Sequence, residues 1–382
     1  MIEVPRIGFV GLGEVITEYA YSPFRELADR GEIKLTAVAD KNDLTGTTAN
    51  LNSRREKHEK QRKAIDDILP RLHSRDLLHY QTNGDRFSPG IEKEFFDNVD
   101  IVYIATPNNA RTGFVQQAVQ RGKAIALEKP IGHTMGVINN IVGLVYQTDS
   151  KAACTEHYSY KDPSLRFFET FHGRTKKFGK ILSIDGIIEE DDFLDAERYS
   201  WILDPSISGG GVWLDLGVHL MHLLYFTGAE VASVKEAKSY YYQFPTGDPR
   251  NSLIKSETGA EVFFRLRGNN GNVDTRAFAH LRTAKCKPYP LKCFKVAFEK
   301  GDVVLDFLTN SISYLDRSNG APVLEHEKLP RTNAYQNFML NFKKSLNNGG
   351  ASFTSLDKIK PSTDAVFETF KHMKSADPRF FY

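Results

Sequence analysis

Three polar side chains suited to proton transfer lie close together between Ser208 and Leu224. Asp215, His219 and His222 recur there at spacings of four and three residues, after three consecutive glycines that would let the backbone approach a ligand. On a helix these spacings place the three side chains on one face. A carboxylate four residues before an imidazole can accept from one ring nitrogen and leave the other to take a proton, which predicts a general base. A buried helix whose histidines bond to backbone carbonyls is the alternative.

The same three side chains could instead ligate zinc. No acidic or cysteine partner at a familiar ligand spacing accompanies them, and we therefore expect no metal site. The acidic cluster from Glu189 to Asp192 also has no other ligand-type side chain spaced with it. We interpret this cluster as a solvated loop.

The elements that would position this chemistry begin at the N-terminus. A short apolar run from Arg6 ends in glycines at Gly13, a helical segment follows to about Asp29, and a second apolar run from Ile33 ends at Asp40. This order of strand, turn, helix and strand is typical of a dinucleotide-binding unit.

In such a unit each position has its own task. Gly11 allows the tight turn, Gly13 lets a pyrophosphate approach the helix N-terminus, and Asp40 binds the ribose hydroxyls of the adenosine. The acid favours NAD, whereas the adjacent Lys41 could accept the 2′-phosphate of NADP. The cofactor-binding residues expected in this region are Gly11, Gly13, Glu14, Val15, Asp40 and Lys41.

Two later strands end in polar loops. Apolar runs at 99–105 and 123–127 are followed by Thr106-Pro107-Asn108 and by Glu128-Lys129-Pro130. Because open α/β sheets bind ligands at the carboxyl ends of their strands, we expect both loops to lie beside the cofactor. Lys129 could polarise a substrate oxygen there, and a surface lysine before a turn proline is the alternative.

The composition narrows the class of protein. The chain has 382 residues, enough for two domains, and 41% of them are hydrophobic, as in globular proteins. A formal charge of +2 gives no reason to expect a nucleic-acid or anionic-membrane partner. Cys154, Cys286 and Cys293 fit reduced core thiols better than a disulfide framework, and no apolar run reaches about 18 residues. We therefore expect a cytoplasmic protein.

The predicted fold is α/β. We expect an N-terminal Rossmann domain at 1–150, with a solvated helix in the charged segment 42–75, and a C-terminal α+β domain at 151–382. A large, mostly antiparallel sheet is predicted from alternating runs at 231–242, 260–267, 273–280, 294–298, 303–307 and 311–315. Closing helices are predicted at 334–346 and 355–373.

Three further side chains are candidate substrate contacts. Lys161 follows a predicted strand toward the cleft, Trp201 could stack on the apolar face of a sugar ring, and His222 belongs to the polar face described above. Arg111, Lys161 and Arg198 could also meet a phosphate or carboxylate of the substrate. A surface or core position is the alternative for each of them.

These motifs together resemble the Gfo/Idh/MocA family, the relatives of glucose-fructose oxidoreductase and inositol dehydrogenase. The resemblance rests on the glycine turn with Asp40, on Thr106-Pro107-Asn108, on Glu128-Lys129-Pro130, and on Gly209-Gly210-Gly211 followed by Asp215, Gly217 and His219. It implies that Lys129, Asp215 and His219 form the catalytic group. It also implies an oligomer contact through the large sheet, and hence a homo-dimer or homo-tetramer.

Three positions depart from the pattern of that family. Ile16 replaces a small residue, Arg111 stands where a histidine often follows the Thr-Pro-Asn loop, and His222 replaces a common aspartate. A local match at 128–133 and 156–162 resembles motifs of glucose-6-phosphate dehydrogenase, and it ranks second.

The residues and the resemblance predict an NAD(P)-dependent oxidoreductase. It would transfer a hydride between nicotinamide and a hydroxyl-bearing carbon of a sugar, cyclitol or related polyol, with or without a phosphate. His219 would take the hydroxyl proton, Asp215 would orient His219, and Lys129 would polarise the oxygen. The alternatives are a glycosidase that oxidises the sugar transiently with tightly held NAD, and a non-enzymatic sugar-sensing regulator.

Overall fold

The computed structural model of the protein describes residues 3–13, 15–40, 78–190, 201–242, 244–268, 271–285, 289–318 and 322–375. Some predictions lie outside these residues: the solvated helix at 42–75, the contacts of Glu14, Lys41 and Arg198, the end of the acidic loop at Asp192, and the thiol of Cys286. Within the described ranges, no helix combines the length and the apolar character that crossing a membrane requires.

The chain divides into two compact units, and each unit is built from separate segments. The first contains Met1–Gly132, Gly136–Thr155 and Tyr335–Asp357, and the second contains His133–Met135, Glu156–Ala334 and Lys358–Tyr382. The predicted single boundary near residue 150 differs from this division, because a segment close to the C-terminus belongs to the first unit.

Long-range contacts hold that segment in the first unit. The backbone N–H of Cys154 donates to the carbonyl of Thr354 at 2.9 Å. This segment therefore lies beside the edge strand of the first sheet and binds to its backbone. The Lys343 ammonium donates to the Glu32 carboxylate at 2.8 Å, across 311 residues of sequence. Pairings over such separations leave no local pattern, which is why the sequence did not indicate them.

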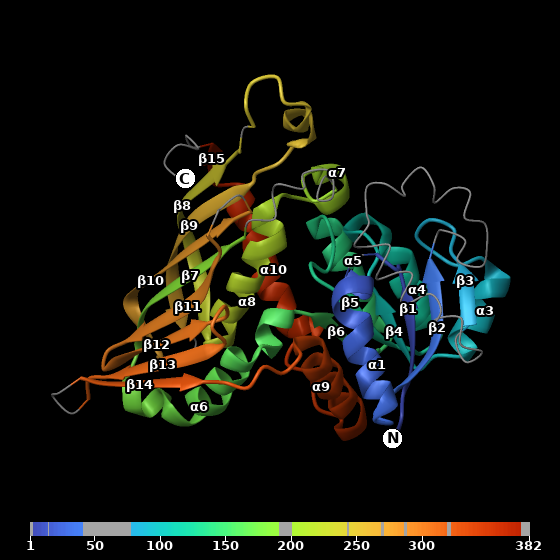
Figure 1. Ribbon diagram of the computed structural model, residues 1–382, viewed down its shortest axis with the longest axis horizontal. Coiled ribbons are helices and arrows are strands. Elements are labelled where there is room, and N and C mark those ends of the chain that lie inside the picture. The colour runs from blue at the N-terminus through green and yellow to red at the C-terminus, as the bar shows by residue number, and fades with distance from the viewer. Residues whose placement is uncertain are drawn as a thin grey trace. The chain divides into compact units, whose positions relative to one another are not determined.

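The first unit is a parallel sheet with helices. The strand order is β3-β2-β1-β4-β5-β6, and every neighbouring pair is parallel (Figure 1). The strands are β1 (Arg6–Val10), β2 (Lys34–Asp40), β3 (Leu78–Gln81), β4 (Ile101–Ile104), β5 (Ala124–Glu128) and β6 (Ala152–Thr155). The helices are α1 (Tyr21–Asp29), α3 (Pro89–Asp97), α4 (Thr112–Gln120), α5 (Met135–Gln147) and α9 (Ala334–Asn348). This order confirms the Rossmann fold, whose ligands bind where the order reverses between β1 and β4.

Apolar runs explain these strands. Every residue of β4 and of β6 is buried, because a parallel sheet with helices on its faces leaves no solvated side. Aromatic rings then join the first helix to the sheet: the Phe24 ring of α1 lies 5.6 Å from that of Phe9 and 5.3 Å from that of Tyr103. The carboxyl ends of β1 and β4 are thus held on a rigid base.

The second unit contains a nine-stranded sheet. Its order is β14-β13-β12-β11-β7-β10-β9-β8-β15, and its neighbours are antiparallel except for β7 with β10 and β8 with β15. The strands are β7 (Ile181–Glu189), β8 (Ala229–Tyr240), β9 (Gly259–Gly268), β10 (Val273–Ala284), β11 (Leu291–Phe298), β12 (Gly301–Asp306), β13 (Ser311–Asp316), β14 (Val323–Lys328) and β15 (Met373–Ser375). The mostly antiparallel sheet is confirmed. The edge strands β14 and β15 were not predicted, because β14 is mostly exposed and β15 has three residues.

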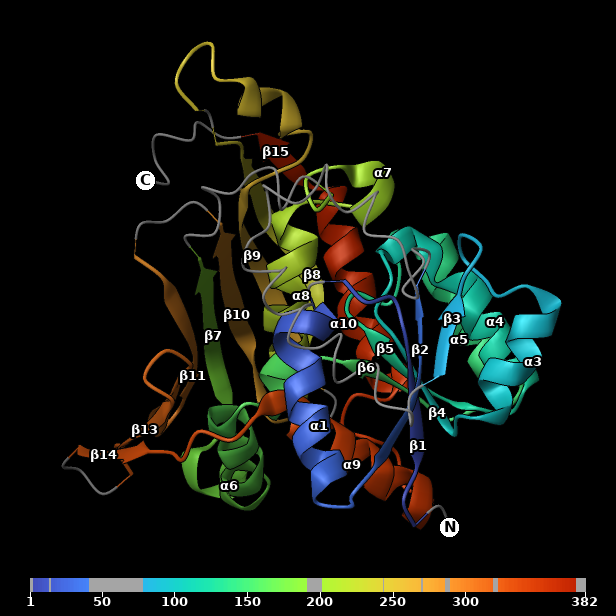
Figure 2. The ribbon, with the colours of Figure 1, turned by 45° about the vertical axis from the view of Figure 1, so that its right-hand side comes forward.

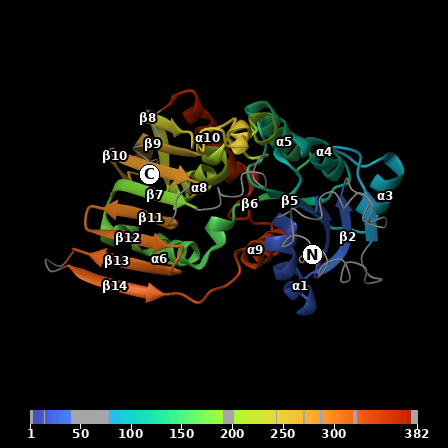
Figure 3. The same ribbon diagram turned by 45° about the horizontal axis from the view of Figure 1, so that its top comes forward.

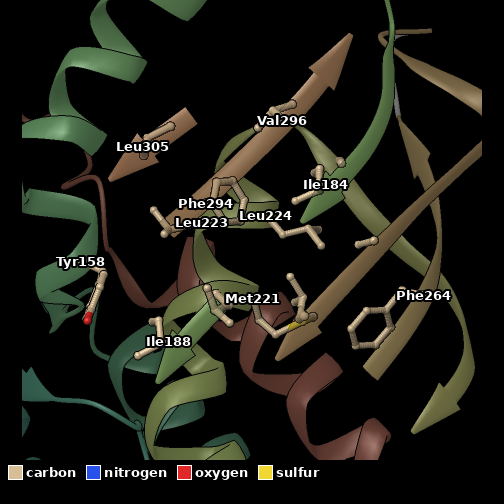
Figure 4. Close-up of a cluster of buried hydrophobic side chains, with 14 of the residues drawn as sticks. Tyr158, Ile184, Ile188, Met221, Leu223, Leu224, Phe264, Phe294, Val296 and Leu305 are labelled. Carbon is tan, nitrogen blue, oxygen red and sulfur yellow. The ribbon is translucent and has the colours of Figure 1, made fainter. Parts of the chain in front are cut away.

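Three helices of the second unit share one apolar core with the sheet. They are α6 (Asp162–Phe178), α8 (Val218–Phe226) and α10 (Leu356–Phe370) (Figures 2 and 3), and the unit also contains the single turn α7 (Pro205–Ser208). Figure 4 shows Met221 and Leu224 of α8 among Ile184, Phe264 and Phe294 of the sheet. Every residue of α8 from 218 to 224 is buried, as expected of a helix that is apolar on all sides. The two histidines of α8 are therefore core residues by position.

Candidate active site

The candidate residues fall into two groups, one in each unit, and each group is described by itself. The strand-tip cluster of the first unit contains Asp40, Thr106, Arg111, Glu128 and Lys129. The ionic cluster of the second unit contains Glu156, Lys161, Glu190, Asp215, His219, Lys285 and Lys292.

The glycine turn after β1 has the geometry that the sequence predicts at Gly11. Its φ is +85°, and an added Cβ would lie 2.9 Å from the backbone nitrogen of Thr106, so only glycine fits between the ends of β1 and β4. Asp40 at the end of β2 accepts a hydrogen bond from the backbone N–H of Leu12 at 2.8 Å. The carboxylate therefore orders the turn, a role that the sequence did not indicate.

The start of the following helix shows the consequence of Ile16. The side chain is buried, with 1% of its surface exposed, and residues Val15–Ala20 form a π-helical turn before α1 begins. A π-helical turn is wider than an α-helical one. A bulky residue at this position thus coexists with a widened helix start.

The turn fits the pyrophosphate of a dinucleotide. Among the described residues, no atom lies within 4 Å of a Cβ added at Gly13, so there is room beside its Cα. Backbone N–H groups at a helix start bind phosphates well. The room beside Gly13, Asp40 at the end of β2 and the reversal of strand order at β1 and β4 therefore fit NAD(P).

A buried arginine joins the two loops of the strand-tip cluster. Arg111 is 3% exposed; its Nε donates to the Thr106 carbonyl at 3.0 Å, and its Nη1 donates to the carbonyls of Glu128, at 2.5 Å, and Pro130. Burial lowers the pKa of Arg111 to about 10. The guanidinium thus holds the tip of β5 against the loop after β4, and its contacts give no support to the predicted phosphate or carboxylate contact of the substrate.

The tip of β5 carries a buried acid beside the candidate lysine. The Tyr103 hydroxyl donates to Glu128 Oε1 at 2.5 Å, and the backbone N–H of Lys129 donates to Glu128 Oε2 at 3.2 Å. Burial raises the pKa of the Glu128 carboxyl. The acid therefore orders the loop, and Lys129, half-buried before a cis bond to Pro130, remains the candidate for contact with ligand.

The Thr-Pro-Asn loop is closed by its own first residue. The Thr106 hydroxyl donates to the carbonyl of Ala110 at 3.1 Å. Pro107 is exposed, whereas Asn108 is 3% exposed. Because the Thr106 backbone lies beside Gly11, this loop remains a candidate cofactor contact.

In the second unit, a buried carboxylate is bound to the candidate base. His219 Nδ1 is hydrogen-bonded to Glu156 Oε1, and both side chains are 1% exposed. Glu156 directly follows β6, and His219 is the second residue of α8. The His219 ring also packs against the rings of His157 and Tyr158, each with a centroid 4.6 Å away. This arrangement fixes the orientation of the imidazole.

Asp215 belongs to a chain of charged side chains. Its carboxylate lies 3.1 Å from the Lys285 ammonium, and Lys285 and Lys292 lie 3.4 and 2.6 Å from Glu190. Although burial alone would raise it, these two ammonium groups hold the pKa of Glu190 at about 2. Asp215 is therefore anchored by a lysine on another element.

The predicted shared face of Asp215, His219 and His222 is not a feature of one regular helix. Asp215 lies in a π-helical turn, Trp213–Gly217, that precedes α8. His222 packs between α8 and α10, where its Nδ1 is 3.3 Å from the Ser362 hydroxyl. Burial lowers the pKa of His222 to about 3. These contacts are those of a core histidine, and they give no support to its predicted contact with substrate.

The three consecutive glycines approach the chain itself. An added Cβ would lie 2.0 Å from the His133 carbonyl oxygen at Gly209 and 2.2 Å from the Glu257 carbonyl oxygen at Gly211. The buried Glu257 carboxylate also accepts from the backbone N–H of Gly211 at 2.9 Å and of Trp213 at 3.0 Å. The predicted reason for these glycines, close approach to a ligand, is replaced by tight internal packing.

Two of the remaining candidates have surface or partly covered positions. Trp201 is 37% exposed and remains a candidate for stacking on a sugar. Lys161 is largely buried, and its ammonium lies 3.8 Å from the centroid of the Tyr158 ring. Across the described residues, no group of three or more His, Cys, Asp or Glu side chains could hold a metal ion.

The sequence missed the residues that bind to the predicted ones. Glu156 follows a buried strand, so the signal that pointed to Asp40 and Glu128 was present there. Lys285 and Lys292 have no such signal, because their partners Glu190 and Asp215 lie far away in the sequence. Ion pairs of this kind become visible only in the folded chain.

Two family models match the chain. The model described as oxidoreductase family, NAD-binding Rossmann fold, matches residues 5–155. The model described as GFO/IDH/MocA C-terminal domain matches residues 174–304. The two matches follow one another along the chain and together cover most of it.

Relatives of known name match over part of their length. Oxidoreductase P35 of Formosa agariphila is 25% identical over 208 residues, which are 53% of this chain and 59% of that protein. Levoglucosan dehydrogenase of Pseudarthrobacter phenanthrenivorans is 26% identical over 244 residues, 58% of this chain and 56% of that protein. The chain thus spans little more than half the length of these relatives.

Solved structures share the fold over almost the whole chain. Aldose-aldose oxidoreductase from Caulobacter crescentus, in complex with glycerol, superposes with a TM-score of 0.71 at 16% identity. The superposition covers 99% of this chain and 98% of that one. At this identity the likeness concerns the fold alone.

Proposed function

Because the chain belongs to the Gfo/Idh/MocA family of oxidoreductases, we propose that it is an NAD(P)-dependent dehydrogenase. Its substrate in this proposal is a sugar, cyclitol or related polyol, oxidised or formed at a hydroxyl-bearing carbon. One relative is named levoglucosan dehydrogenase and another D-xylose 1-dehydrogenase, which supports a sugar substrate. The observation that carries the proposal is the buried pair of Glu156 and His219.

The pair has the properties of a proton acceptor for a hydroxyl group. Glu156 binds Nδ1 of His219, which holds the proton of the neutral ring there and makes Nε2 the atom that takes the hydroxyl proton. The carboxylate then stabilises the imidazolium that results, and the buried surroundings strengthen this attraction. Asp215, predicted to orient His219, stays in the proposed catalytic group with its charge held by Lys285.

Residues of the strand-tip cluster have the other two tasks. We assign Gly11, Gly13, Asp40 and the Thr106–Asn108 loop to the binding of NAD(P), with NAD favoured by the acid. The bound nicotinamide supplies the site that accepts or gives the hydride. Lys129 polarises the substrate oxygen, so that negative charge developing on it is stabilised.

The test is turnover with a panel of neutral sugars, inositols, sugar acids, sugar phosphates and aryl glycosides, followed through the absorbance of NAD(P)H. The wild-type chain should reduce NAD(P) with at least one polyol, and His219→Ala should abolish that reaction while NAD(P) still binds. Glu325→Gln, a change at an exposed position of strand β14, is the control and should leave the rate unchanged.

Two outcomes would replace this proposal. Cleavage of an aryl glycoside without net NADH would identify a glycosidase that uses NAD transiently. Binding of NAD(P) and of a sugar without any turnover would identify a regulatory binder. In both cases the pair of Glu156 and His219 would need another function.

The outer face of the nine-stranded sheet supports an oligomer. Phe263 and His280 stack there with ring centroids 4.2 Å apart, and Phe278 beside them is 48% exposed. We propose that this face forms the contact of a homo-dimer or homo-tetramer, to be measured by light scattering.

Neither Cys154 nor Cys293 forms a disulfide among the described residues, and we propose a cytoplasmic location for the protein.

A further inference from the structure

A lysine stands on the same aromatic ring as the candidate base. Lys161 Nζ lies 3.8 Å from the centroid of the Tyr158 ring and 5.7 Å from that of Phe307. The imidazole of His219 also lies beside the Tyr158 ring, with its centroid 4.6 Å away. The ammonium group and the base therefore both contact one tyrosine, in the short turn His157–Tyr160 that precedes α6.

Lys161 differs from the other lysines of the ionic cluster in its partners. Lys285 and Lys292 each have a carboxylate within 3.4 Å, and both bind Glu190. In the part of the chain that the structure describes, no carboxylate lies within ion-pair distance of Lys161 Nζ. The described contacts of Lys161 Nζ are the rings of Tyr158 and Phe307.

The surroundings make this ammonium group a site for an anion. Burial, and next the charge of Lys292, lower the pKa of Lys161 to about 8, against the opposite effect of Glu190 and Glu156. The group thus still carries its charge at neutral pH, in a place where charge is costly without a partner. An aromatic face compensates a cation less fully than an ionised acceptor, which forms a strong, charge-assisted hydrogen bond.

We propose that Lys161 binds an anionic oxygen group of the substrate, so that the substrate is an acidic sugar or polyol rather than a neutral one. The inference rests on the proposed function, because it places this anion next to the hydroxyl whose proton His219 takes. A neutral hydroxyl at the same place would bring no charge of opposite sign to the ammonium group. The anionic group is a carboxylate or a phosphate, and the experiment separates these two.

Matched sugars test the proposal. Hexoses of the gluco, galacto and manno series are compared with their uronates and their 6-phosphates as substrates of the wild-type chain. We expect kcat/KM for one uronate or one 6-phosphate to exceed that for the matched hexose by about tenfold or more, the effect of a hydrogen bond to a charged group. Preference for the uronate would identify a carboxylate site, and preference for the 6-phosphate a phosphate site.

Two variants connect that preference to the side chain. Lys161→Met should lose about tenfold or more in kcat/KM on the acidic sugar and less than about threefold on the neutral one. Lys161→Arg keeps the charge and should keep the preference. Lys328→Met, the same change on the exposed strand β14, is the control. Equal losses of Lys161→Met on both sugars, or a wild-type preference for the neutral sugar, would overturn the proposal.

Calorimetric binding separates this inference from the proposed dehydrogenase. If no polyol is oxidised, yet an acidic sugar binds the wild type about tenfold more tightly than Lys161→Met, the anion site stands and the dehydrogenase falls. If neutral sugars are oxidised and Lys161→Met behaves as the wild type with every sugar, the dehydrogenase stands and the anion site falls. Thermal unfolding checks that Lys161→Met folds, which we expect because the change removes a buried charge.

Discussion

The two groups of candidate residues are held in place by different kinds of partner: mainly the backbone in one group, and side chains in the other. In the strand-tip cluster, Arg111 donates to backbone carbonyls, and Asp40 accepts from a backbone N–H. In the ionic cluster, side chains bind side chains: Glu156 binds His219, and Lys285 binds Asp215. The first arrangement fixes the path of the chain, and the second fixes the direction of individual polar groups.

This difference has a counterpart in sequence separation. The carbonyls that Arg111 bonds at the tip of β5 lie 17 and 19 residues away. Glu156 is 63 residues from His219, and Glu190 is 95 and 102 residues from Lys285 and Lys292. Loops can therefore be recognised from short motifs, whereas the partners that set protonation and orientation come from distant strands. Removal of the buried arginine from the first cluster should therefore mainly alter stability, and removal of the charge beside His219 in the second should mainly alter the chemical step.

The largest expected effect is on stability, in the variant Arg111→Met. Removing the guanidinium leaves the carbonyls of Thr106, Glu128 and Pro130 without their buried donor, and Glu128 loses a nearby positive charge. We expect a loss of about 3–5 kcal/mol in the free energy of unfolding, measured with urea.

The matched control is Arg121→Met, because the Arg121 side chain is 40% exposed and forms a surface pair with Glu92. That variant should change stability by less than about 1 kcal/mol. Equal effects of the two substitutions would contradict the view that a buried arginine holds the strand-tip loops.

The next effect is on the chemical step, in the variant Glu156→Gln. The amide keeps the shape of the side chain but loses the charge that stabilises the imidazolium of His219. We expect kcat to fall by about 100-fold, roughly 2.7 kcal/mol, with little change in KM for the cofactor.

Glu169→Gln is the control for this variant, since the Glu169 side chain is 70% exposed. If Glu156→Gln lowered the unfolding midpoint strongly and left kcat within about threefold of the wild type, the pair with His219 would be structural only.

A pH-dependent change in stability is expected from the ionic cluster. The pKa of Glu190 is lowered to about 2 in the folded chain from an ordinary value of 4.5. Its contribution to stability is therefore complete above pH 4.5 and is lost as the pH falls toward 2. The difference in unfolding free energy between the wild type and Glu190→Gln should shrink across this window. If this difference stayed constant across the window, the pairs of Glu190 with the two lysines would not contribute to the stability of the folded chain.

The sequence predicted those features that depend on local pattern. The apolar runs of β1, β4 and α8 and the conformation of Gly11 follow from neighbouring residues, and the structure contains them. The partner of His219 was missed because Glu156 lies 63 residues away in the sequence, a separation that no short motif spans. The π-helical turn at Trp213–Gly217 was also missed, since helical spacing alone does not distinguish it from an α-helix.

The membership of α9 in the first unit shows the same limit at the level of a whole element. Its amphipathic pattern predicted a helix over almost the observed length, Ala334–Asn348. The pattern contains no information on which sheet the apolar side covers. Contacts such as Lys343 with Glu32 decide that, across 311 residues of sequence.

The smallest expected effect concerns Asp40, the acid of the strand-tip cluster whose described partner is backbone and whose proposed partner is a ligand. Asp40→Asn keeps an oxygen that can accept from the N–H of Leu12, whereas Asp40→Ala removes it. If the charge binds the ribose, Asp40→Asn should raise KM for NAD by about tenfold, roughly 1.4 kcal/mol, with a smaller change for NADP and no loss of stability. Asp40→Ala, in contrast, should lower the free energy of unfolding by about 1 kcal/mol, because the N–H of Leu12 loses its acceptor. With the exposed Asp29→Asn as control, an unchanged ratio of the two KM values in Asp40→Asn would restrict Asp40 to ordering the turn, as the other members of its cluster order their loops.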